Sequence, residues 1–301
     1  MDLRQLEYFL LVARRGSITA AAADLGIAQP TLTKSIRLLE QELAVALFER
    51  HPRGVVLTDF GRSLLRHAES VHVQVQDAVR EIEGLRGGAV GAVNIGAGPA
   101  WLRRHLPRAV ARSVAKHPGI QVKIEGGFDN ALLRALRHGD LDFVVAELPA
   151  PDRAGDLEAT PLTSDELGVC CRVGHPLVGE RKIGLGRLLD FPWVMPPRAT
   201  RAQKRLRALF VKSDLPPPEA AVETGSMAFL LQMLKDSDSL TFTVRTTLSA
   251  PDGSGLVILD VPELSATRQA GVICRRGGWL SPAAAEILQE LRTICAEDPY
   301  N

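Results

Sequence analysis

The sequence has almost no net charge, because 36 lysine and arginine residues are balanced by 35 aspartate and glutamate residues, leaving a formal charge of +1. This balance argues against a histone-like protein that holds nucleic acid by bulk charge, so any nucleic-acid contact must be local. Cysteine is also scarce. The four cysteines, Cys170, Cys171, Cys274 and Cys295, include an adjacent pair that cannot easily form a disulfide and show no C-x-x-C metal spacing. We therefore expect reduced thiols and no metal site.

Long hydrophobic runs are missing as well. The apolar stretch Leu6–Ala13 ends at Arg14 and Arg15 and is too short to span a bilayer. No basic segment followed by a long apolar segment marks a secretion signal. We expect a cytoplasmic protein without membrane contacts. With 301 residues, 46% hydrophobic and 24% charged, the composition is that of a globular chain with two or three domains.

A long amphipathic helix separates two parts of different composition. Residues 1–60 show helical periodicity, whereas residues after 90 alternate β-rich runs with helical ones. The helix should begin at Thr58–Asp59, whose side chains suit an N-cap, and run to about Arg86, before glycines at 87, 88 and 91. Its apolar residues have the heptad spacing of a coiled coil: Leu64, Ala68, Val71, Val75, Ala78, Ile82 and Leu85. Such a narrow stripe on so long a helix favours dimerisation.

Residues 17–43 have the pattern of two helices joined by a tight turn. Ser17 suits the cap of the first helix, Gly26 the left-handed residue that ends it, and Pro30 the first turn of the second. The second helix has an apolar face for packing, which comprises Leu32, Ile36, Leu39 and Leu43. Its start and polar face can reach base edges and phosphates, and comprise Gln29, Pro30, Thr31, Thr33, Lys34, Arg37 and Gln41.

Two β-rich segments, 47–50 and 55–57, flank a sequence that suits a type I turn, His51-Pro52-Arg53-Gly54. We interpret this as a small wing, with Arg50 and Arg53 placed to contact phosphates or the minor groove. A plain three-helix bundle with a solvated polar face is the alternative. Charge alone does not exclude it, but the ordered combination of turn, helix and wing features argues against it.

These first sixty residues resemble the LysR-type transcriptional regulators. The resemblance is carried by Phe9, GSITAAA at 16–22, LGIAQPTLT at 25–33, Ile36, Leu39-Glu40, Glu42-Leu43, LFER at 47–50, Leu57-Thr58 and Gly61. A looser match continues in HPG at 117–119, LRAL at 133–136, GDLD at 139–142 and GHPL at 174–177. Residues 193–197, with the arginine-rich helix after them, weakly resemble the branch of galactose-binding-protein regulators. The resemblance covers nearly the whole chain.

The resemblance implies a winged helix-turn-helix over 1–58, a linker and dimerisation helix over 59–88, and an effector-binding domain over 89–301. The last would be a two-lobed α/β domain like type 2 periplasmic binding proteins, with lobe I at about 89–162 and 266–301 and lobe II at about 163–265. Implied partners are double-stranded promoter DNA, a small-molecule inducer and further copies of the chain, up to a tetramer, with RNA polymerase as a further candidate. The expected DNA interface is Ser17, Gln29, Pro30, Thr31, Thr33, Lys34, Arg37, Arg50 and Arg53.

Two features depart from the family pattern. Ala28 stands where the family usually has a serine that caps the recognition helix, so capping must rely on Gln29, water or phosphate. Ala44 and Ala46 replace the usual glycine and proline before the wing. These departures concern the geometry of the wing and the helix start rather than the fold.

The second part of the sequence predicts two α/β lobes. Residues 92–146 read as strand, helix, strand, helix, strand, a parallel βαβαβ unit, and a second α/β set follows. In such folds a ligand lies between the lobes, at the C-terminal ends of strands and the N-termini of the helices that follow. The candidate contacts in these loops are Gly98, Pro99, Ala100, Trp101, Phe128, Glu147, Arg198, Thr200, Ser226 and Thr243. If Arg198 faces the cleft, an anionic ligand is favoured; surface positions for Trp101, Glu147 and Arg198 are the alternative.

Catalytic motifs do not assemble. Gly96-Ala97-Gly98 has Trp101 where a dinucleotide fingerprint needs its third glycine, and His67 and His72 do not share a helical face. We expect no enzyme and no cofactor, but a regulator whose promoter binding is controlled by an anionic or aromatic metabolite. One alternative is a constitutive architectural DNA-binding protein whose second half only oligomerises. Another is an enzyme fused to a DNA-binding domain.

Overall fold

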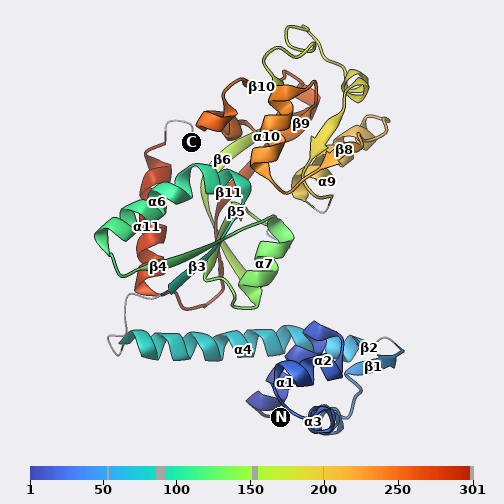
Figure 1. Ribbon diagram of the computed structural model, residues 1–301, viewed down its shortest axis with the longest axis vertical. Coiled ribbons are helices and arrows are strands. Elements are labelled where there is room, and N and C mark those ends of the chain that lie inside the picture. Colours follow the sequence, from blue (N-terminus) through green and yellow to red (C-terminus); the bar gives the residue numbers. More distant parts are fainter. Residues whose placement is uncertain (53, 86–91, 151–154, 199, 299–301) are drawn as a thin grey trace. The chain divides into compact units, whose positions relative to one another are not determined.

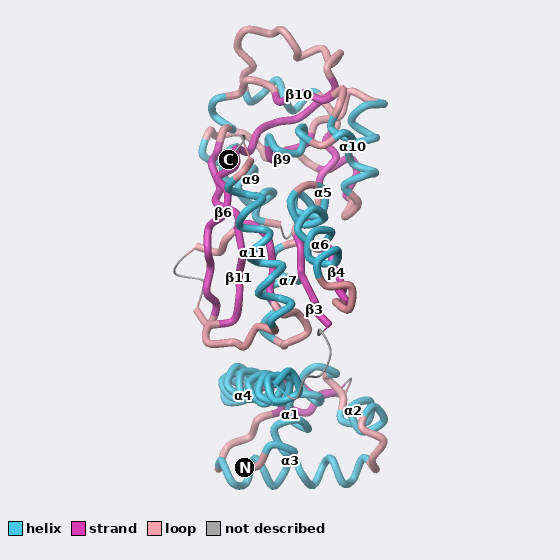
Figure 2. Tube along the Cα trace, turned by 90° about the vertical axis from the view of Figure 1, so that its left-hand side faces the viewer, coloured by secondary structure: helices cyan, strands magenta, loops and turns pink. Residues whose placement is uncertain are grey.

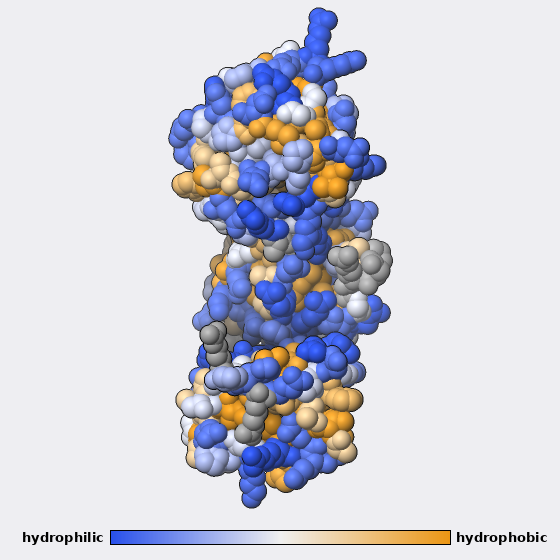
Figure 3. Space-filling view, turned by 90° about the vertical axis from the view of Figure 1, so that its right-hand side faces the viewer, coloured by the Kyte–Doolittle hydropathy of each residue, from blue (hydrophilic) through white to orange (hydrophobic). Residues whose placement is uncertain are grey.

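The computed structural model describes residues 1–52, 54–85, 92–150, 155–198 and 200–298. The chain divides into two compact units, residues 1–86 with 137–139 and residues 87–136 with 140–301. Each unit has its own hydrophobic core. Among the described residues, no helix has the length and apolar character needed to cross a bilayer. The face drawn in Figure 3 accordingly mixes hydrophilic and hydrophobic side chains.

The first unit is a helix-turn-helix followed by a two-stranded wing and a long helix (Figure 1). Its elements are α1 (Leu3–Arg15), α2 (Ile18–Asp24), α3 (Gln29–Leu43), β1 (Phe48–His51), β2 (Gly54–Leu57) and α4 (Asp59–Leu85). The helix boundaries follow the expected caps. The Ser17 hydroxyl accepts from the N–H of Ala20, Gly26 has φ +64°, and the Thr58 hydroxyl accepts from the N–H of Gly61.

Packing of this unit agrees with the predicted apolar face except at one position. Leu32, Ile36 and Leu39 of α3 are buried against Phe9 and Leu10 of α1. Leu43 was predicted to join them, but it is 37% exposed. It is the last residue of α3, and the chain turns at Ala44 with φ 55°, so the side chain lies past the end of the core.

The second unit is a two-lobed α/β domain, and two long strands run through both lobes (Figures 1 and 2). Lobe I contains β3 (Ala92–Ala97), α5 (Pro99–Arg103), α6 (His105–Lys116), β4 (Gln121–Gly126), α7 (Asp129–Arg137), β5 (Phe143–Glu147) and α11 (Pro282–Ala296). Lobe II contains β7 (Trp193–Met195), α9 (Arg201–Lys212), β8 (Ala220–Glu223), α10 (Met227–Asp236), β9 (Thr241–Val244) and β10 (Leu256–Ile258). The shared strands are β6 (Leu157–Arg172) and β11 (Ala266–Arg275).

Lobe I is built as the parallel βαβαβ unit that the sequence predicts. Strand β3 pairs parallel with both β4 and β5. Alternate residues of β5 are buried on opposite faces: Phe143 and Val145 pack with α6 and α11, and Val144 and Ala146 pack with α7. A strand that is covered on both faces has a continuous apolar sequence, which explains why the sequence predicted β5 as a strand. One helix was expected after β3, but Arg104 breaks it into α5 and α6.

The crossing strands join the lobes. Strand β11 pairs antiparallel with β6 from Ala266 opposite Leu167 to Arg275 opposite Leu157. Beyond this pairing, β11 also bonds to β5 of lobe I, while β6 bonds to β9 and β10 of lobe II. This arrangement brings the C-terminal end of β5 close to the strands and helix starts of lobe II.

The burial difference between two paired isoleucines predicts a measurable difference in stability. Ile95 in β3 is fully buried, whereas its register partner Ile124 in the edge strand β4 is 40% exposed. Ile95→Ala should lower the free energy of unfolding by about 2–5 kcal/mol through lost burial and a cavity, and the matched control Ile124→Ala by about 1 kcal/mol or less. Urea unfolding followed by tryptophan fluorescence measures this, because all three tryptophans lie after residue 90. Equal effects would contradict the packing of β3.

Candidate functional site

The exposed face of α3 carries the polar residues that the sequence singled out. Gln29, Pro30, Thr31, Lys34 and Arg37 are exposed, and Thr33 is half-buried. The Gln29 side-chain amide donates to the Thr33 hydroxyl at 3.2 Å. Gln29 therefore does not cap the helix, and the N-cap residue Ala28 makes no side-chain hydrogen bond. Pro30 has no backbone N–H and the N–H of Thr31 donates to the Ala28 carbonyl at 2.9 Å, so among the described residues at the start of α3 the N–H of Gln29 is the one that remains open to an anion such as a phosphate.

A glutamate of α3 is withdrawn from this face. The Glu40 carboxylate accepts from the N–H groups of Leu47 and Phe48, at 2.8 and 3.2 Å, and so holds the start of the wing. This leaves Lys34 and Arg37 as the charged residues of the α3 face near its start. Ser17 is half-buried, and its hydroxyl is engaged as the cap of α2. Arg53 and the side chain of Arg50 lie outside the described residues.

The heptad stripe of α4 is divided along its length. Leu64 and Ala68 pack into the core of the first unit. Further along, Val71, Val75, Ile82 and Leu85 are exposed, with Leu85 at 82%. Leu64 and Ala68 therefore stabilise the first unit and are not available to a partner helix. The remaining ones form an exposed apolar stripe, called here the α4 stripe.

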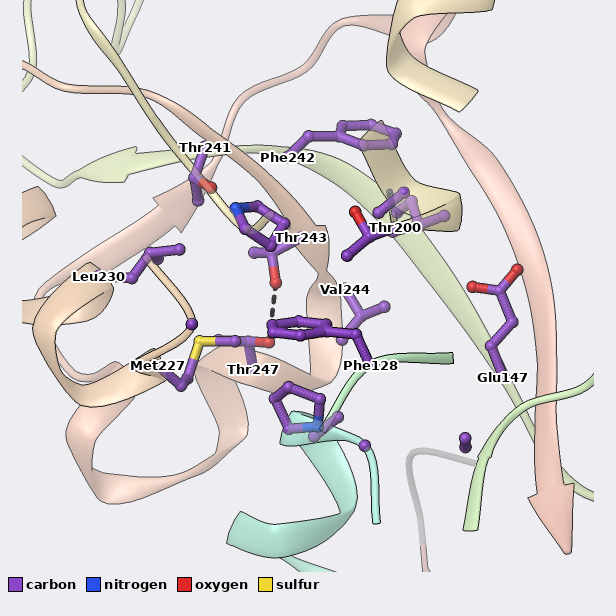
Figure 4. A pocket seen from close by; sticks show the side chains of 18 of the residues that line it. Phe128, Glu147, Thr200, Met227, Leu230, Thr241, Phe242, Thr243, Val244 and Thr247 are labelled. Carbon is purple, nitrogen blue, oxygen red and sulfur yellow. Dashed lines mark hydrogen bonds between the residues drawn. The ribbon is translucent and has the colours of Figure 1, made fainter. Parts of the chain in front are cut away.

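A cavity of about 90 Å³ lies between the two lobes of the second unit, large enough for several waters or a small metabolite (Figure 4). Nine of the ten predicted contacts line it: Gly98, Pro99, Ala100, Trp101, Phe128, Glu147, Thr200, Ser226 and Thr243. The sequence interpretation missed several others, including Leu230, Thr241, Phe242, Thr247 and Arg268. Most of the lining is apolar or aromatic, with hydroxyl groups between.

Arg198 is the one predicted contact that does not line the cavity. Its side chain is 78% exposed and lies 3.8 Å from the Glu223 carboxylate. Thr200, which caps α9, does line the cavity. The arginine found at the cavity is Arg268, 14% exposed, in the shared strand β11. No loop or helix-start signal marks Arg268, because only its register with β6 brings it there.

Glu147 is a buried and paired carboxylate rather than an exposed loop residue. It is 7% exposed; Arg205 donates to its Oε1 at 2.9 Å, and Arg268 to its Oε2 at 3.4 Å. Arg201 donates to the backbone carbonyls of Glu147 and Leu148, at 2.9 and 2.6 Å. Two arginines of α9 thus hold the end of β5, and this contact joins lobe II to lobe I beside the cavity.

Hydroxyl groups line much of the rest of the cavity. Thr243 and Thr247 share a hydrogen bond of 3.2 Å, which Figure 4 draws as a dashed line. Thr200 and Ser226 cap α9 and α10, so both helices begin at the cavity. Thr241 is fully buried, and its hydroxyl is among the few buried side-chain groups of the described residues without a hydrogen-bond partner. A polar group kept buried without a partner is costly to the fold.

The cysteines offer no reactive thiol. All four are free, as expected. Burial raises the pKa of the Cys170 and Cys171 thiols to about 12, and that of Cys274 to about 11. Thiolates, the nucleophilic form, are therefore scarce at neutral pH.

Comparison with known proteins gives matches over both units. The family description "Bacterial regulatory helix-turn-helix protein, lysR family" matches residues 3–62, and "LysR substrate binding domain" matches residues 86–296. The transcriptional regulator GbpR of Azospirillum brasilense is 30% identical over 97% of this chain and 86% of its own. The regulator PcaQ of Agrobacterium fabrum is 31% identical over 99% and 96%. The crystal structure of CbnR, a LysR family transcriptional regulator, is similar in fold, with a TM-score of 0.60, 19% identity and coverage of 99% and 100%.

The threonine cluster predicts opposite effects for two matched substitutions. Thr247→Val removes the partner of the Thr243 hydroxyl and should lower the free energy of unfolding by about 1–2 kcal/mol. Thr241→Val replaces a buried hydroxyl that has no partner with an isosteric methyl group, and should leave stability unchanged or raise it by about 1 kcal/mol. Urea unfolding of the ligand-free protein compares the two. Equal destabilisation would mean that Thr241 is bonded in the fold.

Proposed function

Since this chain belongs to the LysR family of transcriptional regulators, we propose that α3 and the wing bind promoter DNA and that an anionic or aromatic metabolite in the cavity controls this binding. The observation that carries the proposal is the cavity itself. It is lined by residues of both lobes and bounded by the starts of α9 and α10. A ligand that touches both lobes stabilises one arrangement of them over others.

We assign the DNA contacts by reach and chemistry. Gln29, Thr31 and Thr33 would lie nearest the bases, since short hydrogen-bonding side chains at the start of a recognition helix contact base edges. Lys34 and Arg37, together with Arg50 and Arg53 of the wing, would contact phosphates. Pro30 would position the start of α3, and Ser17 would position the start of α2. The exposure of the α3 face and the inward turn of Glu40 support this assignment.

The proposed domains are residues 1–58 for DNA binding, 59–88 for the linker helix and 89–301 for effector binding. Within the last, lobe I would comprise 89–162 with 266–301, and lobe II 163–265. The crossing of β6 and β11 supports lobe limits near these residues. The α4 stripe would pair with the same stripe of a second copy, and paired dimers would give a tetramer. We further propose that the protein acts in the cytoplasm and has no catalytic activity.

Recovery and sequencing of genomic fragments bound by the purified full chain tests the regulator against an architectural protein. A regulator should give discrete peaks over a dyad-symmetric site, since two copies present two recognition helices. Diffuse binding that salt readily disrupts would favour the architectural alternative. The genes beside the recovered sites would also narrow the ligand class.

Two neighbouring substitutions on α3 should separate base reading from phosphate binding. Thr33→Ala should reduce discrimination between the recovered site and mismatched sites, at about 1–3 kcal/mol for a lost base contact. Lys34→Ala should weaken binding to all DNA about equally and lower the salt dependence. Lys212→Ala, at the end of α9, serves as the control for loss of a surface lysine. The reverse pattern for Thr33 and Lys34 would mean that another face of α3 meets the groove.

The α4 stripe predicts an effect on self-association. Val75→Asp places a charge at the centre of the exposed stripe and should shift the protein toward monomer in sedimentation velocity, because an unpaired buried charge is costly. Gln74→Asp adds the same carboxylate one residue away, at an exposed position off the heptad spacing, and is the matched control. Dimerisation of the Val75→Asp variant as tight as that of the control would rule out this stripe as the interface.

A further inference from the structure

The two ends of the cavity differ in chemistry. Thr241, Met227 and Leu230 lie at one side of the cavity and Glu147 lies at the other (Figure 4). The first end offers hydrogen-bond donors, and the second offers a carboxylate. A ligand that satisfies both ends must therefore itself have two different ends.

The threonine end is suited to a single carboxylate. Helix α10 begins there, with no acidic residue in its first turn. The Ser226 hydroxyl accepts from the N–H of Phe229, so the N–H groups of Met227 and Ala228 remain among those that a helix start leaves open. The Thr241 hydroxyl, fully buried at this end and without a partner among the described residues, is a second donor independent of the helix. Together they can hold a carboxylate by hydrogen bonds alone.

The Glu147 end is suited to a hydrogen-bond donor. A carboxylate can accept about four hydrogen bonds, and the described contacts use one on each oxygen, from Arg205 and Arg268. The remaining acceptor sites suit a ligand hydroxyl. A second ligand carboxylate would instead meet the Glu147 carboxylate, and two like charges in contact are unfavourable. The Arg268 guanidinium is already shared by Glu147, at 3.4 Å, and Asp165, at 3.7 Å.

The walls between the ends are flat and apolar. Phe128 contributes an aromatic ring, and Met227 and Leu230 contribute flexible apolar surface. The Trp101 and Phe242 rings belong to the cores of lobe I and lobe II, which back the cavity. The cavity volume of about 90 Å³ is suited to a ligand of one ring with small substituents. These walls favour an aromatic ring over a fully hydroxylated sugar.

We propose that the cavity selects a single-ring aromatic monocarboxylate with a hydroxyl group opposite the carboxylate, and that Glu147 determines this selectivity. Glu147 accepts the hydrogen bond from the ligand hydroxyl and repels a second carboxylate. This inference rests on the proposed function, since it takes the cavity as the effector site.

Titration calorimetry of the full chain with four probes tests the selectivity. 4-Hydroxybenzoate should bind most tightly. Benzoate, which lacks the hydroxyl, should bind about tenfold more weakly, as expected for one hydrogen bond to a charged group. Terephthalate, with a second carboxylate, and 4-hydroxybenzyl alcohol, with none, should bind at least about tenfold more weakly.

Variants assign the selectivity to Glu147. Glu147→Gln keeps the side-chain shape but removes the charge, so it should bring terephthalate to within about threefold of 4-hydroxybenzoate. Glu166→Gln makes the same change at an exposed glutamate that pairs with Arg245 outside the cavity, and should alter none of the ratios. Thr241→Val should weaken the carboxylates together and leave their ratios unchanged.

Three results would overturn the proposal: terephthalate binding as tightly as 4-hydroxybenzoate to the unaltered protein, unchanged ratios in Glu147→Gln, or no binding of any aromatic acid. The first would mean that Arg268 rather than Glu147 meets the ligand.

A separate variant tests whether the cavity is the ligand site at all. Gly225→Leu should fill the cavity, because a Cβ there would lie 3.9 Å from the Phe128 ring. If probes bind this variant as tightly as the unaltered protein, the ligand site is elsewhere, whatever the ratios.

Discussion

The antiparallel pairing of β6 with β11 is the constraint on which the second unit depends. These two strands run through both lobes. Strand β11 also pairs with β5 of lobe I, and β6 also pairs with β10 of lobe II, so the pairing of β6 with β11 makes the sheet continuous from one lobe to the other. The pairing shifts register between Ala270 and Gly271, and a Cβ at Gly271 would lie 2.1 Å from the Thr160 carbonyl oxygen. Any side chain at this position would clash with the backbone of β6, so glycine is required there. Any rearrangement of the lobes must pass through this pair of strands.

The cavity lies beside that pairing and draws residues from both lobes. Glu147 ends β5 in lobe I, Arg205 lies on α9 in lobe II, and Arg268 lies on the shared strand β11. A ligand that bonds to Glu147 at one end and to the start of α10 at the other acts on both lobes at once. The buried Thr241 hydroxyl fits this account, since a group that does not help the fold is expected at a functional site.

The sequence predicted those parts of the structure that depend on local pattern. The arginine-rich helix expected after residue 197 is α9, and the cap at Ser17 and the left-handed Gly26 are where the sequence predicted them. Nine cavity residues were predicted correctly from their positions near the ends of strands and the starts of helices, because these ends meet at one edge of a sheet.

The residues that the sequence missed depend on distant pairing. Arg268 lies mid-strand, and only the register of β11 with β6 brings it to the cavity. Thr241 lies two residues before the predicted Thr243 in β9, so the alternation of a strand could have placed both on the cavity face. Thr247 lies in the turn of helix after β9, and its hydrogen bond to Thr243 had no local signal. The prediction for Arg198 was wrong for a different reason. A guanidinium suits an anionic ligand, which made Arg198 a candidate, but this residue precedes the N-cap of α9 and its side chain is 78% exposed.

A ligand in the cavity should change how the protein holds DNA. The most direct measurement is the DNase I footprint and DNA bend angle of the full chain on a recovered genomic site, titrated with the tightest-binding aromatic acid. We predict that the footprint changes length and the bend angle shifts as the cavity fills, and that Gly225→Leu shows neither change. An identical footprint and bend angle at saturating ligand would contradict the claim.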